Sequence, residues 1–133
     1  MPSWTSNVQV ENMKNSDCVF CKIINKEIPA EIVYEDNDFL AFKTIEPVST
    51  GHTLVIPKKH AENVLDIEQV TLEKLSGVAQ KVAKDLVKRH SATGINLLHA
   101  AGKNAQQSVF HFHMHVVPRY ENDNLDLWFK NKL

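Results

Sequence analysis

Three histidines alternate with apolar residues in one short stretch, His111-Phe112-His113-Met114-His115. Side chains two positions apart on a β-strand point to the same side, so this pattern predicts three imidazoles on one face. A neutral imidazole is a base or nucleophile near neutral pH, and three together resist simultaneous protonation because like charges repel. Binding of a phosphate dianion would relieve that repulsion. The pattern therefore favours phosphate chemistry, and the alternatives are incidental histidines on a surface strand or a transition-metal site.

Two polar residues directly before the histidines extend this chemistry. Gln107 and Ser108 provide an amide and a hydroxyl, and both groups can hydrogen-bond to phosphate oxygens or to a leaving group. We therefore include both residues in the candidate site.

Cys18 and Cys21 are the only cysteines of the chain and are separated by two residues. In a reducing compartment this spacing is typical of metal ligands or of a redox-active dithiol. The redox dithiol is the rival interpretation, because the pair opens a predicted helix, where thiolates are stabilised, but the sequence has no other thioredoxin-like feature. Two plain thiols are the third interpretation.

The composition is that of one ordinary globular domain. The chain has 133 residues, 43% of them hydrophobic, and a formal net charge of -1, which argues against a nucleic-acid partner. No apolar run approaches the ~18 residues of a membrane span, and residues 1–13 do not resemble a signal peptide. We expect a cytoplasmic protein with a flexible arm over residues 1–15 and one domain over residues 16–133.

The elements that must position these residues follow from hydrophobic periodicity. The long helical pattern over residues 66–89 places one apolar stripe on one face, made of Leu75, Val78, Ala79, Val82 and Leu86. A short helix is expected over 21–26, and strands over 32–34, 39–45, 53–56, 95–98 and 109–117. This order predicts an α+β fold with helices packed on an antiparallel sheet.

The segment 107–117 resembles the signature of the histidine triad (HIT) family, in which histidines alternate with apolar residues. Segments 18–24, 26–30, 34–36 and 51–60 are similar to the same family, so the resemblance covers residues 17–120. It points to the histidine-triad nucleotide-binding branch, of the bacterial type with a CxxC zinc site. The third histidine, His115, argues against the uridylyltransferase branch, which has glutamine there.

This resemblance implies a single HIT domain with a five-stranded antiparallel sheet, one long helix and one short helix. It also implies a homodimer in which the sheets of two chains join into one. The short apolar strand over 95–98 is the candidate edge.

The resemblance also implies a mechanism. His113 would attack the α-phosphorus of a nucleotide and form a nucleotidyl-histidine, which water then hydrolyses. A backbone carbonyl would hold the other ring nitrogen of His113. His111 and His115 would flank the phosphate, with His52 supporting the site.

Two further family positions act on the substrate. Ser108 matches the serine on the leaving-group side, and Gln107 matches a residue that contacts phosphate.

The implied ligand is a purine nucleotide such as AMP or GMP. Four residues match the lining of the slot for the base, and each could equally be an ordinary core residue: Phe20, Ile23, Ile45 and Leu54. Thr44 stands where the family has an acidic residue that bonds the ribose. Ala100 lies in a segment where the family has asparagine. Because each lost hydrogen bond is worth roughly 0.5–3 kcal/mol, these departures weaken sugar recognition.

A structural zinc is implied by the match of four residues to the bacterial ligand set, namely Cys18, Cys21, His60 and His111. No organic cofactor is expected.

The function expected from these features is a nucleoside phosphoramidase or nucleotidyl hydrolase. Two alternatives remain open. The first is a nucleotide-binding regulatory or scaffold protein with vestigial catalysis, and the second is a dinucleoside polyphosphate hydrolase.

Overall fold

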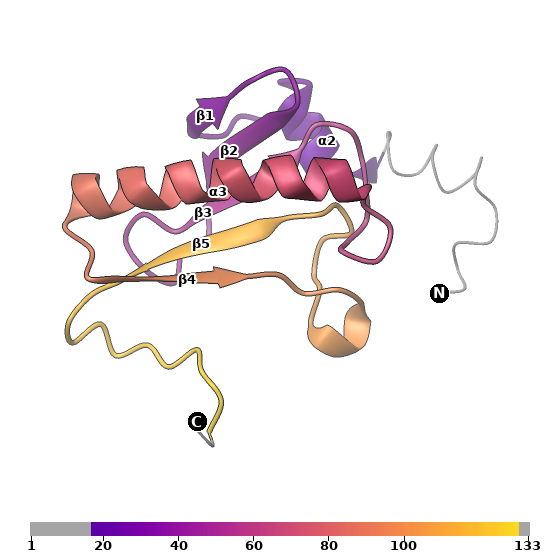
Figure 1. Ribbon diagram of the computed structural model, residues 1–133. Helices are drawn as coiled ribbons and strands as arrows, with labels where there is room; N and C mark the ends of the chain where they lie inside the picture. The colour runs from indigo at the N-terminus through magenta and orange to yellow at the C-terminus, as the bar shows by residue number, and fades with distance from the viewer. Residues whose placement is uncertain (1–16, 131–133) are drawn as a thin grey trace.

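The computed structural model describes residues 17–130, so the arm expected over residues 1–15 lies outside the described part. Its elements, in chain order, are α2 (Val19–Ile24), β1 (Ile32–Glu35), β2 (Phe39–Lys43), β3 (Thr53–Pro57), α3 (Gln69–His90), β4 (Gly94–Leu98), the 3-10 turn η1 (Lys103–Ala105) and β5 (Met114–Arg119) (Figure 1). The expected α+β arrangement is confirmed. No helix in the described part combines the length and apolarity needed to cross a membrane.

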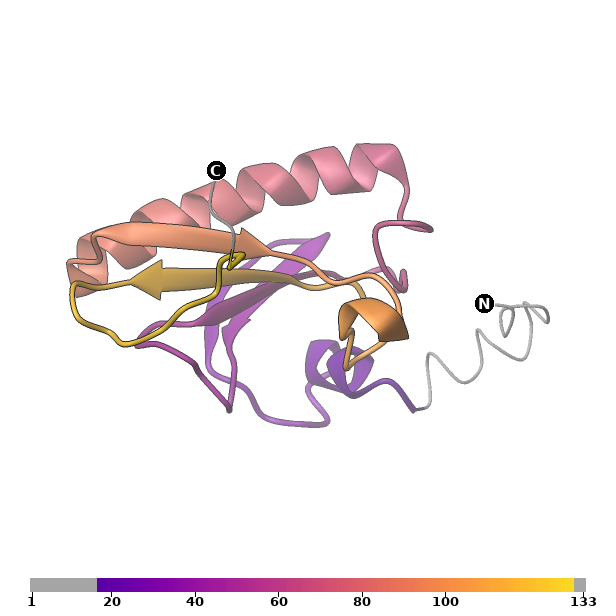
Figure 2. The same ribbon diagram turned by 90° about the horizontal axis from the view of Figure 1, so that it is seen from below.

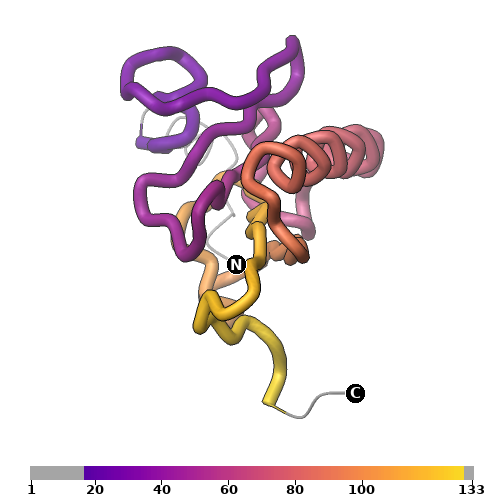
Figure 3. The backbone as a smooth tube through the Cα atoms, turned by 90° about the vertical axis from the view of Figure 1, so that its left-hand side faces the viewer, coloured from indigo at the N-terminus to yellow at the C-terminus, as the bar shows by residue number. Residues whose placement is uncertain are grey.

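The strands form one five-stranded antiparallel sheet in the order β1-β2-β3-β5-β4. Helix α3 crosses one face of the sheet, while α2 and η1 lie on the opposite side (Figure 2). An end-on view shows the same separation, with α3 on one side of the sheet and the indigo segment that contains α2 on the other (Figure 3). The inner strands are therefore covered on both faces, and β4 is an edge strand.

Alternation along the inner strands divides the apolar residues between two cores. The core on the α3 side includes Phe39, Ala41, Val55, Phe112 and Val116. The core on the α2 side consists of Phe20, Ile23, Leu40, Phe42, Leu54 and Ile56. Because both faces are covered, β2 and β3 are continuous runs of apolar residues that do not alternate with polar ones.

Helix α3 buries the five residues expected from its periodicity. It begins at Gln69, three residues after the predicted start. The Asp66 carboxylate accepts hydrogen bonds from the backbone N–H groups of Glu62 and Asn63, at 2.9–3.1 Å. Asp66 thus closes a separate turn before the helix, which explains the later start.

Two further element ends differ from those expected. The short helix α2 begins at Val19 and ends at Ile24, because the chain turns through Lys26, whose φ is 65°. Strand β2 ends at Lys43, and Ile45 lies in the following turn with 93% of its surface exposed.

The strand predicted over residues 109–117 is shorter at its start, because β5 begins at Met114. His111 and His113 therefore precede the strand, and only His115 lies within it. Phe20 of α2 nevertheless contacts both His111 and His113, with ring centroids 5.9 and 5.2 Å away. The three histidines still lie on the α2 side of the sheet.

Pro57 at the end of β3 explains the late start of β5. Proline has no N–H to donate to a neighbouring strand. Its carbonyl accepts from the Nε2–H of the His111 side chain at 2.8 Å, where a backbone amide of a longer β5 would have bonded. The Phe112 N–H instead donates to the Ala61 carbonyl at 2.7 Å. The histidine segment therefore leaves the regular ladder.

We predict that Phe112→Ala lowers the free energy of unfolding by about 3–5 kcal/mol, because Phe112 is fully buried in the α3-side core. The matched control is Phe110→Ala, since Phe110 is 42% exposed; its change should stay within about 0.5–1 kcal/mol. Urea unfolding measures both values. Equal losses in the two variants would contradict this packing.

Candidate active site and metal centre

His113 is a buried histidine with a defined tautomer. Its Nδ1 lies 2.8 Å from the His111 carbonyl oxygen, and 6% of its surface is exposed. A carbonyl oxygen can only accept, so Nδ1 carries the proton and Nε2 keeps its lone pair. In the neutral ring Nε2 is therefore unprotonated and can act as a base or a nucleophile.

His52 fixes the tautomer of His115 in the same way. Nδ1 of His52 accepts from the Val48 N–H at 3.2 Å, so its Nε2 carries the proton. This Nε2–H donates to Nδ1 of His115 at 2.9 Å. A neutral His115 must then carry its own proton on Nε2. His115 is thereby a hydrogen-bond donor, and its ring centroid lies 5.0 Å from that of His113.

Burial keeps these imidazoles neutral. Burial is the main cause that lowers the pKa of His113 below the usual 6.5, although the bond to His111 opposes it. Burial, and then the neighbouring charge of His113, lowers the pKa of His115 to about 4. Burial also lowers the pKa of His52. At neutral pH the site therefore contains an uncharged imidazole, His113, with an unprotonated Nε2, beside the uncharged hydrogen-bond donor His115.

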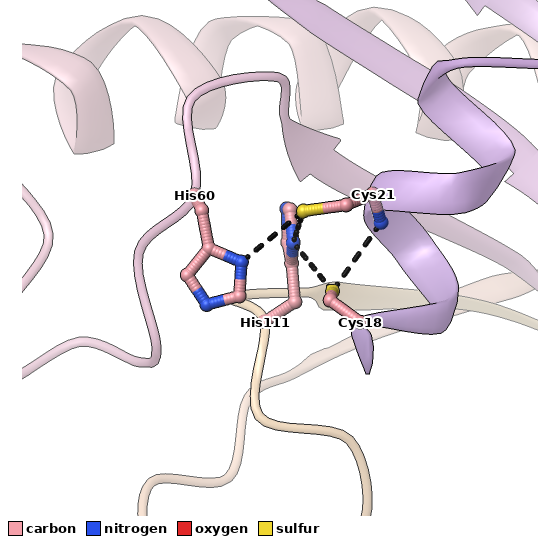
Figure 4. Close-up of side chains that lie close together, drawn as sticks. All are labelled: Cys18, Cys21, His60 and His111. Atoms are coloured by element: carbon pink, nitrogen blue, oxygen red, sulfur yellow. Dashed lines mark hydrogen bonds between the residues drawn. The ribbon is translucent and has the colours of Figure 1, made fainter. Parts of the chain in front are cut away.

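A second cluster lies behind the first and consists of Cys18, Cys21, His60 and His111 (Figure 4). Nδ1 of His111 lies 3.2 Å from Sγ of Cys18 and 3.5 Å from Sγ of Cys21. Nδ1 of His60 lies 3.3 Å from Sγ of Cys21. The four expected ligands thus meet, with their donor atoms all within 4.8 Å of one another.

The donor set of this cluster fits zinc. Tetrahedral zinc with ordinary Zn–S and Zn–N bonds separates sulfur from nitrogen by about 3.6 Å, close to the 3.2–3.5 Å found here. The His111 Nε2–H donates to the Pro57 carbonyl, which leaves the Nδ1 lone pair facing the sulfurs. Such a carbonyl partner is the usual way in which a zinc-binding histidine is oriented.

The sulfur chemistry agrees with a metal site. Hydrogen bonding to Cys21, followed by bonds to His111 and His60, holds the pKa of the Cys18 thiol far below its usual range. Thiolates are the form of cysteine that binds metal.

Gln107 is buried, and its amide makes four hydrogen bonds within the protein. Nε2 donates to the carbonyls of Glu62 and Val109, at 2.7 and 3.1 Å. Oε1 accepts from Asn63 Nδ2 and from the Gly102 N–H, at 3.1 and 2.8 Å. These bonds tie the loop before the histidines to the loop after β3. Contact between this amide and a phosphate would require one of them to break.

Ser108, in contrast, is exposed at the surface.

The expected base slot is only partly assembled. Phe20, Ile23 and Leu54 lie together in the α2-side core, and Phe20 also packs edge-on against His113. Ile45 projects into solvent instead. Thr44 is bonded through its N–H to the His52 carbonyl at 3.3 Å, which places it beside the histidine site.

His99 belongs to this site, although sequence reasoning assigned it no role. It lies immediately after β4, and its Nδ1 is 3.1 Å from the His113 carbonyl oxygen. Its spacing from the other histidines matches no strand or helix period, so only the fold brings them together.

The HIT domain family matches residues 25–122, and the chain belongs to this family. It is similar to a zinc-bound histidine triad family protein from Mycobacterium smegmatis, with 42% identity, a TM-score of 0.79 and coverage of 83% of this chain and 80% of that one. A hypothetical histidine triad nucleotide-binding protein from Sulfolobus tokodaii has 43% identity and a TM-score of 0.78, with coverage of 86% and 77%. A HIT family hydrolase from Clostridium thermocellum has 38% identity and a TM-score of 0.71, with coverage of 86% and 96%. The resemblance found in the sequence is confirmed.

We predict that protein purified without chelator carries one zinc per chain and that Cys18→Ala loses it. Zinc at about 100 times its Kd stabilises the native state by about 2.7 kcal/mol, so Cys18→Ala should also lower Tm. Elemental analysis and thermal unfolding measure the two effects.

The control is His90→Ala, because His90 lies outside the cluster and its loss should leave the zinc content unchanged. Metal-free wild-type protein, or equal zinc in Cys18→Ala, would show that the cysteines are plain thiols.

Proposed function

We propose that this protein is a nucleoside phosphoramidase or nucleotidyl hydrolase that acts at the α-phosphate of a purine nucleotide through His113. The observation that carries the proposal is the bond from the His113 Nδ1–H to the His111 carbonyl at 2.8 Å. It leaves Nε2 unprotonated and holds the ring in one orientation. The hydrolase from C. thermocellum supports the general class of activity.

In the first step, Nε2 of His113 attacks the α-phosphorus. A P–N bond to the histidine forms, and the bond from phosphorus to the leaving atom breaks. The leaving group takes that electron pair and a proton from the Ser108 hydroxyl, and the water of the second step restores this proton. The histidine ring becomes cationic, and the His111 carbonyl stabilises it through the Nδ1–H bond.

In the second step, water attacks the same phosphorus. The P–N bond to His113 breaks, the ring recovers its lone pair, and a nucleoside monophosphate is released. The proton lost by the water replaces the one that the leaving group removed.

The other residues have roles that follow from their hydrogen bonds. His115, kept as an Nε2–H donor by His52, is suited to bond a phosphate oxygen. Both ring nitrogens of His111 face protein atoms, so we assign its contribution to its main-chain carbonyl. Gln107 shapes the phosphate-binding loop through its internal bonds, and direct contact with phosphate stays a prediction.

The α2-side core is the proposed support for the base of the nucleotide. We propose that the base lies against Phe20, Ile23 and Leu54, beside the nucleophile. AMP and GMP are the ligands to test first, in agreement with the nucleotide-binding relative from S. tokodaii. The exposed Ile45 and the Thr44 hydroxyl would form the outer rim of the slot, next to the ribose.

Zinc would have a structural role. Cys18 and Cys21 flank Phe20 on α2, and His111 precedes the nucleophile by two residues. A metal held by these residues would fix α2 against the histidine segment.

We predict that His113→Ala abolishes turnover of a fluorogenic adenosine phosphoramidate and keeps nucleotide affinity. Removal of a covalent nucleophile has cost on the order of 10⁶-fold in kcat, whereas binding is shared among many groups. Steady-state kinetics and calorimetry with AMP measure the two properties.

His90→Ala is the control and should turn over normally. Mass spectrometry of rapidly quenched wild-type enzyme should detect a nucleotide adduct on His113. Near-normal turnover by His113→Ala would eliminate the mechanism, and nucleotide binding without turnover by the wild type would favour the scaffold protein.

We predict that Ser108→Ala slows substrates with basic leaving groups on the order of 10²-fold and substrates with good leaving groups much less. A hydroxyl that passes a proton to the departing atom matters most when that atom is basic. A series of leaving groups, including a diadenosine polyphosphate, measures the dependence. Ser76→Ala on the exposed side of α3 is the control; equal slowing across the series would remove Ser108 from this role.

We also propose a homodimer in which the edge strand β4 pairs with β4 of a second chain. Leu97 on this strand is 49% exposed, although it belongs to an apolar run. An unpaired edge of this kind is a template for strand pairing, and two-fold dimers are the commonest oligomers.

We predict sedimentation at the mass of two chains at micromolar concentration and dissociation in Leu97→Lys. Leu65→Lys is the control, since Leu65 is 83% exposed and lies outside the sheet. Sedimentation of the wild type as a single chain would contradict the dimer.

A further inference from the structure

His99 connects the loop after β3 to the backbone of the nucleophile. It is the first residue after β4, and both of its ring nitrogens are hydrogen-bonded to main chain. Nε2 lies 3.0 Å from the Val64 amide nitrogen, and Nδ1 lies 3.1 Å from the His113 carbonyl oxygen. The imidazole thereby bridges two segments that no strand pairing joins.

The two bonds define one tautomer. The Val64 N–H can only donate, so Nε2 of His99 accepts and carries no proton. The His113 carbonyl can only accept, so Nδ1 of His99 donates its proton to it. His99 is therefore a neutral bridge that accepts through Nε2 and donates through Nδ1. Both bonds require the same tautomer, the one protonated on Nδ1.

The ring also packs against the histidine segment. It stacks on Phe112, with centroids 4.3 Å apart and planes at 20°. Phe112 is fully buried and donates its N–H to the Ala61 carbonyl. His99 thus stacks on Phe112, the residue before His113, and donates to the carbonyl of His113 itself.

The bond from His99 matters because the His113 carbonyl lies at the start of β5. His113 is the last residue before β5, and β4 pairs with β5 only as far as Leu98 opposite His115. The peptide between His113 and Met114 therefore lies at the start of β5, just beyond the last residue pair of β4 and β5. The His99 side chain extends the support given by β4 to the carbonyl of this peptide.

We infer that His99 is a positioning residue for the nucleophile His113. The Nδ1–H of His99 holds the His113 carbonyl, and this bond orients the imidazole of His113 toward the phosphorus. The inference rests on the proposed function of His113. The orientation acts through the backbone, because the ring of His113 is held separately by the His111 carbonyl. Both ends of the nucleophile are then fixed, its ring by one carbonyl and its own carbonyl by His99.

Two substitutions separate the two bonds of His99. The amide nitrogen of His99→Asn occupies the place of Nδ1 and can donate to the His113 carbonyl, while the bond from Val64 is lost. The amide oxygen of His99→Gln reaches the place of Nε2 and can accept from Val64, while the bond to His113 is lost. Each variant loses one hydrogen bond and the stacked ring, so similar losses of Tm are expected.

Turnover should distinguish the two variants where stability does not. Because His99→Asn keeps the bond to the His113 carbonyl, we expect its kcat for the adenosine phosphoramidate to fall far less than that of His99→Gln. In His99→Gln, kcat should fall by up to about 100-fold with little change in KM, as when a reacting group is displaced by about 1 Å. A kcat that follows Tm in both variants, or a wild-type kcat in His99→Gln, overturns the inference.

A second readout needs no substrate. Long-range ¹⁵N–¹H spectra report which ring nitrogen of His113 is protonated. Loss of the His99 bond should let the His113 backbone shift, which misaligns its ring with the His111 carbonyl. The Nδ1–H form should therefore persist in wild type and His99→Asn and give way to a mixture in His99→Gln. An unchanged His113 spectrum in His99→Gln counts against His99 even if the wild type proves inactive, whereas wild-type inactivity with the expected spectra removes only the proposed reaction.

Discussion

The hydrogen bond from the His113 Nδ1–H to the His111 carbonyl is the interaction on which the site depends. It requires a segment that is not a regular strand, since in a strand the main-chain carbonyl of residue 111 would be committed to the ladder. Pro57 makes this available, because it has no N–H and its carbonyl takes the His111 side chain. The irregular backbone is thus the reason that a buried, neutral imidazole can keep one nitrogen free.

The surrounding contacts replace the ladder that the segment has left. Phe112 bonds the Ala61 carbonyl, and Gln107 bonds the Glu62 carbonyl. Together with the His111 side chain, they attach the histidine segment to β3 and the loop that follows it. This same loop brings His60 to the two cysteines. The cysteine cluster and His113 therefore share one support, the loop between β3 and α3.

Periodicity predicted most of the fold, because α3 and the inner strands bury their apolar faces locally. The metal ligands were also predictable from residue types and family register, and the structure brings all four together. The start of β5 was not predictable, since it depends on Pro57, which is distant in sequence. The role of His99 was hidden for the same reason: its partners lie 35 and 14 residues away. Ile45 matched a family position, but β2 ends before it, so it is exposed.

His111 uses different parts of itself for its two tasks. Its ring belongs to the cysteine cluster, and its main-chain carbonyl accepts from the Nδ1–H of His113. Every amino acid at this position would supply a main-chain carbonyl, whereas the ring is specific to histidine. Replacement of the two cysteines or of the His111 ring would therefore leave in place the carbonyl that accepts from His113. The two sites are adjacent in space, yet a substitution can remove the ligands of one and leave the main-chain bond of the other.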